Sequence, residues 1–363
     1  MLLSDICEII MGQSPSSDSY NVKGQGLPFF QGNADFGKLY PSVRLWCNCP
    51  IKKAEAGDLL VSVRAPIGAV NLANQKCCIG RGLAALRPYR DKCDAMYLYY
   101  LIKAGKNKLN WLGTGSTFKA ITRSSLLSFN VPDYCMALQR KISGKLWSVD
   151  KLIHQRNEQL KLFDLLIQSR FLEMFSAVQS RVLMKDICSI ITDGTHQPPK
   201  FVTYGIPFIF VSNIVGNEIT YNAEKFIDQK TYDELIKRTP IEIGDLILST
   251  VGSYGHPAVV RSNRKFLFQR HIAYLKPRHE LVNSDYLHSA ILTEDVQRQI
   301  NSQVNGIAQK TLNLSSIKQL QILVPPLEQQ EQFVCFKRQV DKSKYGGTIF
   351  LHLLEDIRIC CNI

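Results

Sequence analysis

KISGKLWSVDKLIHQRNEQLKLFDLLIQSRFLEMF, residues 141–175, is the stretch that decides the organisation of the chain. It contains no proline, and its apolar residues recur at heptad spacing, which predicts a long amphipathic helix with a packing seam. The predicted seam residues are Leu146, Val149, Ile153, Leu160, Phe163, Ile167 and Met174. At a rise of about 1.5 Å per residue this helix would be roughly 50 Å long, which is long enough to act as a spacer.

The seam is imperfect and wide. Arg156 and Arg170 occupy companion positions of the heptad, where a coiled coil would normally place apolar residues. Further leucines widen the apolar surface beyond a two-stranded stripe: Leu152, Leu162, Leu165 and Leu166. The helix therefore needs a partner helix or the face of a domain.

The segments on either side of this helix are two copies of one pattern. Residues 3–10 (LSDICEII) return as residues 184–191 (MKDICSII), and residues 56–62 (AGDLLVS) return as residues 243–249 (IGDLILS). Further pairs keep the same order: Arg81 with Arg270, Gly115 with Gly306, Lys119 with Lys310, and residues 131–132 with residues 324–325. A collinear series across both halves indicates a duplication of whole domains.

The duplication divides the chain into four predicted regions. They are a first domain at residues 1–139, a central helix at 140–180, a second domain at 181–330 and a C-terminal helical region at 331–363. The last region contains Gly346 and Gly347, and each glycine inside a helix costs about 1 kcal/mol relative to alanine. We therefore expect the second helix to be shortened or altered.

Each copy predicts a mixed α/β (α+β) fold with a small twisted sheet and helices. Residues 59–63 and 246–250 follow Gly-Asp and are apolar, which is typical of buried strands. Residues 96–108 and 284–300 are predicted to be helical. Residues 3–11 are interpreted as a short amphipathic segment, with Ser4 as its N-cap or turn residue.

Composition narrows the class of partner. The 363 residues carry a formal net charge of +13, which indicates either a polyanionic partner or simply solvated lysines. The 11 cysteines contain no Cys-x-x-Cys pair, so we expect no metal site and a reducing, cytoplasmic environment. No run of 18 apolar residues and no leader pattern is present, so we expect no membrane partner.

Candidate nucleic-acid contacts lie in the loops that follow the predicted strands and helices. Glycine lets the backbone approach a ligand, and amides, hydroxyls and guanidinium groups can contact bases or phosphates. The alternative reading is that these are plain surface loops, with Arg81 and Arg270 in ion pairs inside each domain. The candidates are Gln31, Asn33, Arg64, Arg81, Ser116, Thr117 and Lys119 in the first copy, and His196, Asn213, Ser253, Tyr254, Arg270, His271, Gln309 and Lys310 in the second.

These motifs together resemble a known family. The GDLLVS strand at residues 57–62, the GTGS loop at 113–116 and the VPPLEQQ lead at 324–330, with their duplication, are similar to the specificity subunit of type I restriction-modification systems. The resemblance covers nearly the entire chain. It implies that each repeat is a target recognition domain that reads one half of a split double-stranded DNA site.

The resemblance also implies the partners. The helices after each domain would form an antiparallel coiled coil that fixes the gap between half-sites and docks two methyltransferase (M) subunits, and a restriction (R) subunit would complete the complex. S-adenosylmethionine, ATP and Mg²⁺ would belong to those partner subunits, and this chain would be non-catalytic and hold no cofactor.

Two other classes stay open on the residues alone. The chain has no Asn/Asp-Pro-Pro-Tyr/Phe motif and no His-Glu-x-x-His motif, but a self-sufficient nucleic-acid-processing enzyme could use an unfamiliar site. A duplicated scaffold that binds only proteins is the third reading, and salt-dependent DNA binding would separate it from the first.

Overall fold

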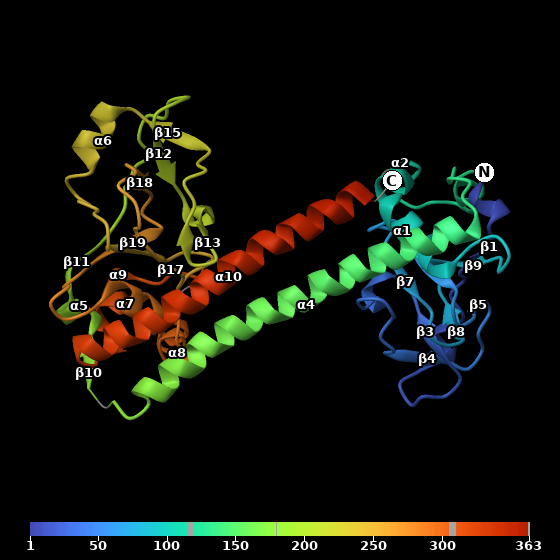
Figure 1. Ribbon diagram of the computed structural model, residues 1–363, viewed down its shortest axis with the longest axis horizontal. Coiled ribbons are helices and arrows are strands. Elements are labelled where there is room, and N and C mark those ends of the chain that lie inside the picture. Colours follow the sequence, from blue (N-terminus) through green and yellow to red (C-terminus); the bar gives the residue numbers. More distant parts are fainter. Residues whose placement is uncertain (115–118, 179, 305–309, 362–363) are drawn as a thin grey trace. The chain divides into compact units, whose positions relative to one another are not determined.

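The computed structural model describes residues 1–114, 119–178, 180–304 and 310–361, without the side chains of residues 357–361. The chain divides into two units (Figure 1). Unit 1 contains Met1–Glu158 and Thr348–Ile363, and unit 2 contains Gln159–Gly347. Each unit therefore holds one copy of the repeated pattern together with a segment of each long helix.

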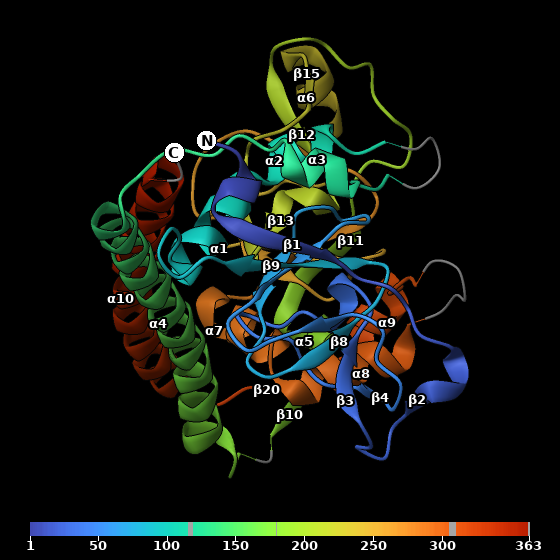
Figure 2. The ribbon, with the colours of Figure 1, turned by 90° about the vertical axis from the view of Figure 1, so that its right-hand side faces the viewer.

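Unit 1 is built on two sheets. The first has strand order β1-β9-β6-β7, entirely antiparallel, and Figure 2 shows β1 and β9 side by side. The second has order β2-β4-β3-β8-β5, with β3 parallel to β8. The strands are β1 (Cys7–Met11), β2 (Tyr20–Asn21), β3 (Leu27–Phe30), β4 (Leu45–Cys47), β5 (Lys53–Ala54), β6 (Leu59–Ser62), β7 (Val70–Leu72), β8 (Cys77–Ile79) and β9 (Leu83–Pro88).

Strand β6 is buried on both faces because helices cover one side and the second sheet covers the other. Leu59 and Val61 pack into the helix-side core with Leu98 and Ile102, whereas Leu60 packs into the core that the second sheet contributes. Helix α1 contacts β6 and β7, and α3 contacts β1. The helices are η1 (Leu3–Asp5), η2 (Ser17–Ser19), η3 (Asn33–Asp35), α1 (Ala95–Ala104), α2 (Lys106–Trp111) and α3 (Arg123–Leu127).

Unit 2 repeats this plan. Its main sheet has the order β11-β19-β16-β17, the counterpart of β1-β9-β6-β7, and β12 is parallel to β18 as β3 is to β8. The strands are β10 (Arg181–Leu183), β11 (Cys188–Asp193), β12 (Ile206–Ile209), β13 (Ile214–Val215), β14 (Glu218–Ile219), β15 (Lys225–Ile227), β16 (Leu246–Ser249), β17 (Pro257–Val259), β18 (Leu267–Phe268), β19 (Ile272–Pro277) and β20 (Gln321–Leu323). The helices are α5 (Met184–Ile187), η4 (Val211–Asn213), α6 (Gln229–Leu235), α7 (Ser284–Ile291), α8 (Glu294–Gln303) and α9 (Leu314–Gln319). The mixed α/β fold with duplicated sheets is confirmed.

Three local expectations need correction. The predicted amphipathic segment at residues 3–11 is a single 3-10 turn followed by strand β1, whose residues alternate in burial because β1 pairs with β9. The helix predicted at 96–108 ends at Gly105, where α2 begins. The helix predicted at 284–300 is two helices, because Thr293 caps α8 through a hydrogen bond from Val296 N to its Oγ1 (3.5 Å).

The two long helices are α4 (Met136–Phe175), of 40 residues, and α10 (Leu327–Cys361), of 35 residues. Helix α10 runs without a break through Gly346 and Gly347. Contacts on either side hold this part of α10: Lys344 pairs with Asp164 in unit 2, and Phe350 lies under Arg156 in unit 1. These contacts offset the cost of about 1 kcal/mol per glycine.

Within each unit the α4 and α10 segments pack antiparallel. In unit 2 the ring of Phe171 lies 5.3 Å from that of Phe333, and Arg170 lies over Phe336. In unit 1 Arg156 lies 5.1 Å from the centre of the Phe350 ring. The two arginines that interrupt the heptad pattern therefore make cation–π contacts, which let them occupy seam positions.

The predicted seam residues lie as follows. Leu146 and Ile153 are buried. The remaining five, Val149, Leu160, Phe163, Ile167 and Met174, are half-buried.

Candidate nucleic-acid interface

The repeated Gly-Asp motif has a structural role in both domains. Asp58 accepts hydrogen bonds from Arg87 Nε (3.0 Å) and Nη2 (2.8 Å). Asp245 accepts one from the hydroxyl of Tyr274 (2.7 Å), and burial raises the pKa of the Asp245 carboxyl. Both aspartates cap the turn just before β6 or β16 through a backbone N–H. The motif therefore fixes the start of the central strand, whose far end leads to the candidate contact loops.

In unit 1 the loops at the far ends of the strands are hydrogen-bonded to one another in a row. We call residues 12–14, 31–33, 64–68, 80–82, 113–114 and 119–121 edge 1. The backbone N–H of Val63 donates to Gly82 O (2.9 Å), and that of Gly82 donates to Gln31 O (3.1 Å). The N–H of Ile121 donates to Val63 O (2.9 Å), and Arg64 forms a bridge with Ala120. Segments far apart in the sequence thus form one continuous edge.

Unit 2 builds the same edge from its own loops. We call residues 194–196, 209–213, 250–256, 269–271 and 310–312 edge 2. The N–H of Thr250 donates to His271 O (3.0 Å), and that of Gly252 donates to Lys310 O (3.2 Å). The N–H of Arg270 donates to Thr195 O (3.0 Å). The bridge from Val251 to Thr311 corresponds to the bridge from Arg64 to Ala120 in edge 1.

Each edge requires a glycine where two segments meet. A Cβ atom on Gly12 would lie 2.2 Å from Gly80 O, and one on Gly194 would lie 2.2 Å from Phe268 O. Real Cβ atoms do not approach a carbonyl oxygen so closely, because of steric repulsion. The first loop of each copy therefore carries glycine for packing and leaves its neighbouring side chains free to differ.

The structure brings most of the predicted contact residues onto these edges. The exposed ones are Gln31, Arg64, Arg81 and Lys119 on edge 1, and His196, Ser253, Arg270 and Lys310 on edge 2. Asn33, Tyr254 and His271 are half-buried. Ser116, Thr117 and Gln309 lie outside the described residues. The exposed side chains include guanidinium, amide, hydroxyl and ammonium groups, which can contact base edges and phosphates.

Asn213 is engaged inside its own domain. Its Oδ1 accepts from Phe210 N (2.9 Å), its Nδ2 donates to Asn222 O (3.1 Å), and the residue is 7% exposed. In the first copy Asp35 holds the equivalent turn, accepting from Gln31 N (2.8 Å). Asn213 is the last residue of η4 and Asp35 is the last residue of η3, so position in the turn pairs Asn213 with Asp35 and not with Asn33, and both residues shape the turn.

Two other candidates on edge 2 have side-chain partners in the domain. His196 Nε2 lies 2.9 Å from Asp193 Oδ2, and the Tyr254 hydroxyl donates to Asn301 Oδ1 (2.9 Å). Burial, and then the charge of Arg270, lowers the pKa of His271. The neutral imidazole of His271 can therefore accept a hydrogen bond near neutral pH.

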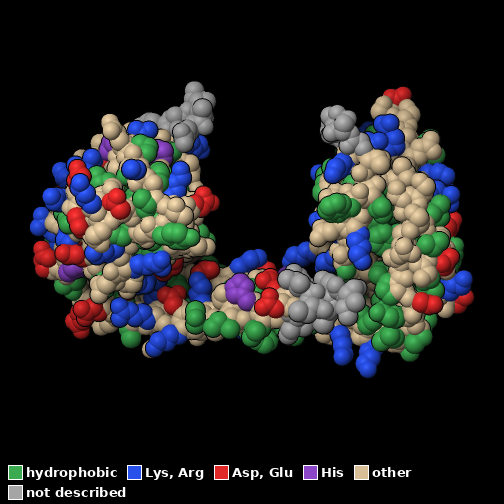
Figure 3. Space-filling model, turned by 90° about the horizontal axis from the view of Figure 1, so that it is seen from above, with side chains coloured by type: hydrophobic (Ala, Val, Ile, Leu, Met, Phe, Trp, Pro, Cys, Tyr) green, Lys and Arg blue, Asp and Glu red, His purple; other side chains and the backbone are tan. Residues whose placement is uncertain are grey.

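Charge is distributed unevenly along each copy. Residues 59–90 and 95–132 contain no aspartate or glutamate, and neither do residues 246–277. These stretches supply the central strands, the loops after them and α2. On the face seen in Figure 3, lysine and arginine side chains are spread over the surfaces of both copies. The acid-free stretches match what a polyanion requires near its phosphates.

Two buried glutamines, which the sequence reading missed, join the domain of each unit to its long helix. Gln139 of α4 accepts from Asp94 N (2.9 Å) and donates to Lys92 O (2.9 Å) and Tyr134 O (2.8 Å). Asp94 is the N-cap of α1. The glutamine thus ties the start of α1 to the start of α4.

Gln330 of α10 makes the same three bonds in unit 2. Its Oε1 accepts from Asn283 N (2.8 Å), and its Nε2 donates to Leu281 O (3.1 Å) and Pro325 O (2.7 Å). Asn283 is the N-cap of α7. The sequence did contain a signal for this role. Each long helix has a glutamine in its first turn, shortly after the Val-Pro that closes the domain.

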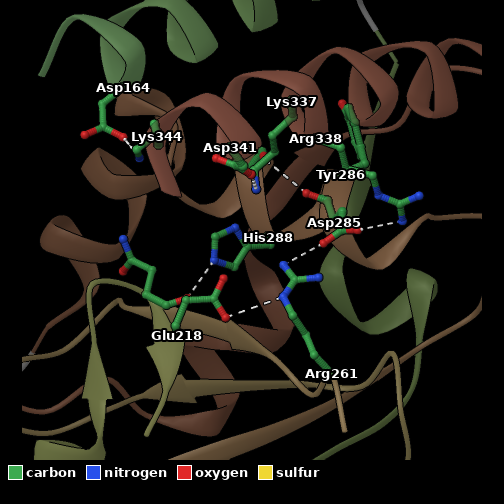
Figure 4. Close-up of polar contacts among 12 residues, drawn as sticks. Asp164, Glu218, Arg261, Asp285, Tyr286, His288, Lys337, Arg338, Asp341 and Lys344 are labelled. Carbon is green, nitrogen blue, oxygen red and sulfur yellow. Dashed lines mark hydrogen bonds and ion pairs between the residues drawn. The ribbon is translucent and has the colours of Figure 1, made fainter. Parts of the chain in front are cut away.

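An ionic link also joins the domain to α10 in unit 2, as Lys103 of α1 pairs with Asp150 of α4 (3.2 Å) in unit 1. Asp285 of α7 pairs with Arg261 (2.8 Å) and with Arg338 of α10 (3.1 Å), as Figure 4 shows. Although burial opposes it, these guanidinium groups hold the pKa of the Asp285 carboxyl below its usual range. Nearby His288 Nε2 donates to Asn217 O (3.0 Å), and burial lowers the pKa of His288 to about 4. These residues line a groove beside α4 and α10.

Two further observations concern only the described part of the chain. It contains no group of three or more His, Cys, Asp or Glu side chains arranged to hold a metal ion. None of its helices combines the length and the apolar character needed to cross a bilayer.

Comparison with known proteins gives consistent results. The model of the family described as type I restriction modification DNA specificity domain matches residues 1–162 and again residues 182–345. The putative type I restriction enzyme MjaX specificity subunit of Methanocaldococcus jannaschii is 44% identical over 152 residues, which are 42% of this chain and only 36% of that protein. The MjaIX specificity subunit of the same organism is 22% identical over 358 residues, covering 89% of this chain and 82% of that protein.

The match to one of the solved structures extends over the entire chain. The type I restriction-modification system S subunit from M. genitalium is 14% identical, with a TM-score of 0.60, and the match covers 100% of this chain and 94% of that one. At this identity the likeness concerns the fold.

Proposed function

We propose, from the premise that this chain belongs to the family of the type I restriction modification DNA specificity domain, that it is a DNA-sequence recognition subunit whose two domains each read one half of a split target. Edge 1 and edge 2 carry this proposal. The same row of loops is built twice, and the two rows share backbone hydrogen bonds: Val63 N–H to Gly82 O matches Thr250 N–H to His271 O, and Ile121 N–H to Val63 O matches Leu312 N–H to Thr250 O. The side chains on the two rows differ. Reading two different half-sites requires the same backbone arrangement in both domains with different side chains facing the DNA.

The long helices would serve as spacer and docking surface. Leu162 and Leu165 of α4 are 62% and 56% exposed, and Leu152 and Leu166 are also exposed. Exposed leucines on a helix that already has a partner mark a surface for protein association. In line with the family, we assign this surface to methyltransferase subunits, with a restriction subunit joining the complex.

The chemistry would then lie outside this chain. We propose that the subunit is non-catalytic and cytoplasmic, and that S-adenosylmethionine, ATP and Mg²⁺ are held by its partners. Its own contribution would be to hold DNA so that a base in each half-site reaches a methyltransferase.

Selection from a pool of duplexes with a randomised central region tests the DNA-reading role. The full chain with its methyltransferase subunits should enrich two short specified blocks separated by an unspecified gap. Affinity for the enriched duplex should fall steeply with salt, because lysines and arginines displace counterions from phosphates. Enrichment of no sequence, or binding that ignores salt, would overturn the proposal and favour a scaffold that binds only proteins.

The docking role has a separate test. Leu162→Ser combined with Leu165→Ser should weaken co-purification of the methyltransferase subunits and leave DNA binding by the chain itself intact. Tyr204→Ser is the matched control, since Tyr204 is 86% exposed and lies outside the long helices. Equal effects of the two changes on co-purification would contradict the assignment.

A further inference from the structure

Trp111 stands almost entirely in solvent. It ends helix α2 (Lys106–Trp111) and is 88% exposed, the largest exposed fraction among the large apolar residues that the structure describes. Its neighbour Leu112 is 42% exposed. An exposed indole makes no contribution to the core, and tryptophan is enriched at binding sites because it offers a large rigid face and one N–H donor. We therefore expect Trp111 to contact a binding partner.

Helix α2 borders edge 1. At one end, a Cβ on Gly68 would lie 3.0 Å from Lys106 Cγ, so the first residue of α2 touches the turn after β6. At the other end, a Cβ on Gly113 would lie 2.8 Å from Ile67 Cδ1. Thr114 then exchanges two backbone hydrogen bonds of 3.0 Å with Ala120, the residue bridged to Arg64. Trp111 is thus held beside the turn that carries Arg64.

The surroundings of Trp111 are positively charged. Lys106 and Lys108 share its helix, and residues 95–132 contain no carboxylate side chain. Among the described residues, Arg64, Lys106, Lys108 and Lys119 form no ion pair, so their charges remain available. An apolar ring within a field of unpaired cations fits the sugar-phosphate and base surface of nucleic acid, which is anionic outside and has apolar faces within.

We infer that Trp111 is a DNA-contacting residue of the first recognition domain, and that its indole packs against sugars and base edges of one half-site while Lys106 and Lys108 contact the flanking phosphates. This inference rests on the proposed function and adds a contact outside the loops that the repeat pattern marks. Lys119 corresponds to Lys310 in the duplication, so Trp111 corresponds to Ser302, whose hydroxyl donates to Gln299 O (2.8 Å). The contact is therefore specific to the first half-site.

Binding to the best duplex selected from the randomised pool tests the inference. Trp111→Ala in the full complex should weaken binding by roughly tenfold or more, as expected for an interfacial tryptophan, and Trp111→Phe should retain most of the affinity. Because the side chain is 88% exposed, neither change should alter the unfolding midpoint. Repeating the selection with Trp111→Ala should reduce sequence preference in one block only, the same block that Arg64→Ala changes.

Tyr89→Ala is the matched control. Tyr89 is also an exposed aromatic residue beside a lysine, Lys92. It follows Pro88 at the opposite end of β9 from Arg81, and a strand of this length spans roughly 20 Å. Its replacement should leave DNA affinity unchanged.

A second readout uses fluorescence. Trp111 is one of three tryptophans, so Trp46→Phe with Trp147→Phe leaves it as the sole indole. Titration with the selected duplex should quench its emission, and titration with methyltransferase subunits should not.

The outcomes separate the inference from the proposed function. If the unaltered complex selects no sequence, the proposed function fails. If the unaltered complex selects a sequence and Trp111→Ala binds that duplex with an affinity within twofold of the unaltered complex, the inference is overturned while the proposed function stands. Loss of methyltransferase binding with normal DNA binding would likewise overturn the inference and assign Trp111 to a protein contact.

Discussion

Replacing Gln330 tests how the domain of unit 2 is attached to α10. The side chain is fully buried, and Gln330→Ala would remove three hydrogen bonds, leaving the backbone groups of Asn283, Leu281 and Pro325 without this partner. A buried polar group left unsatisfied costs about 1–3 kcal/mol. Since such terms are not additive, we expect the free energy of unfolding of unit 2 to fall by about 3–5 kcal/mol.

Urea unfolding of the purified full chain, with hydrogen exchange of residues 281–286 as a local probe, measures this loss. Those amides should exchange faster in Gln330→Ala, because Gln330 fixes the start of α7. The adjacent Gln329 is exposed, so Gln329→Ala should change stability by no more than about 0.5 kcal/mol. The reasoning is refuted if the two variants unfold at the same urea concentration with the same local exchange.

Three further predictions follow from the edges and the ionic link. Lys119→Ala and Lys310→Ala should weaken binding to specific and random duplexes alike, and each should lower the slope of DNA affinity against salt by about one. Gln31→Ala, Arg64→Ala and Tyr254→Phe should instead change which sequence is preferred. If these three variants affect both duplex types equally, their residues do not read the sequence. The pKa of the Asp285 carboxyl is lowered in the folded protein. Its ion pairs therefore stabilise the fold fully above the unfolded-state value near 3.9 and lose this effect as pH falls through the lower folded value. Asp285→Asn should flatten the loss of stability below about pH 4, and parallel pH profiles of the two proteins would show that the ion pairs contribute nothing. Gly12→Ala should lower the free energy of unfolding by roughly 2 kcal/mol, because its Cβ would lie 2.2 Å from Gly80 O. Gly32→Ala is the control and should be neutral, since its Cβ would meet nothing within 4 Å. Similar thermal midpoints for the two variants would contradict the close approach at Gly12.

Features that repeat in the sequence were predictable, because a duplication gives every element two independent chances to be seen. The buried strands after Asp58 and Asp245 and the matched loops were predicted in this way, whereas the long α4 helix was predicted from its heptad spacing. Strand β1 was harder to predict. Five residues such as Cys7–Met11 fit a helix or a strand equally well until the pairing partner is known.

The remaining differences come from tertiary contacts that no local pattern records. The glycines at 346 and 347 stay helical because Lys344 and Phe350 are anchored on either side. Asn213 resembles a contact residue in sequence, but the turn uses both of its polar atoms. In the sequence Trp111 reads as an ordinary apolar residue, and only its exposure beside edge 1 distinguishes it.

The central claim is that edge 1 and edge 2 read separate parts of one duplex. The most direct measurement compares the sequences that the complex selects when one edge at a time is altered, with Arg64→Ala on edge 1 and Ser253→Ala on edge 2. We predict that each variant changes the preferred bases in one block, that the two blocks differ, and that the gap between them keeps its length. A single variant that changes both blocks, or two variants that change the same block, would contradict the claim.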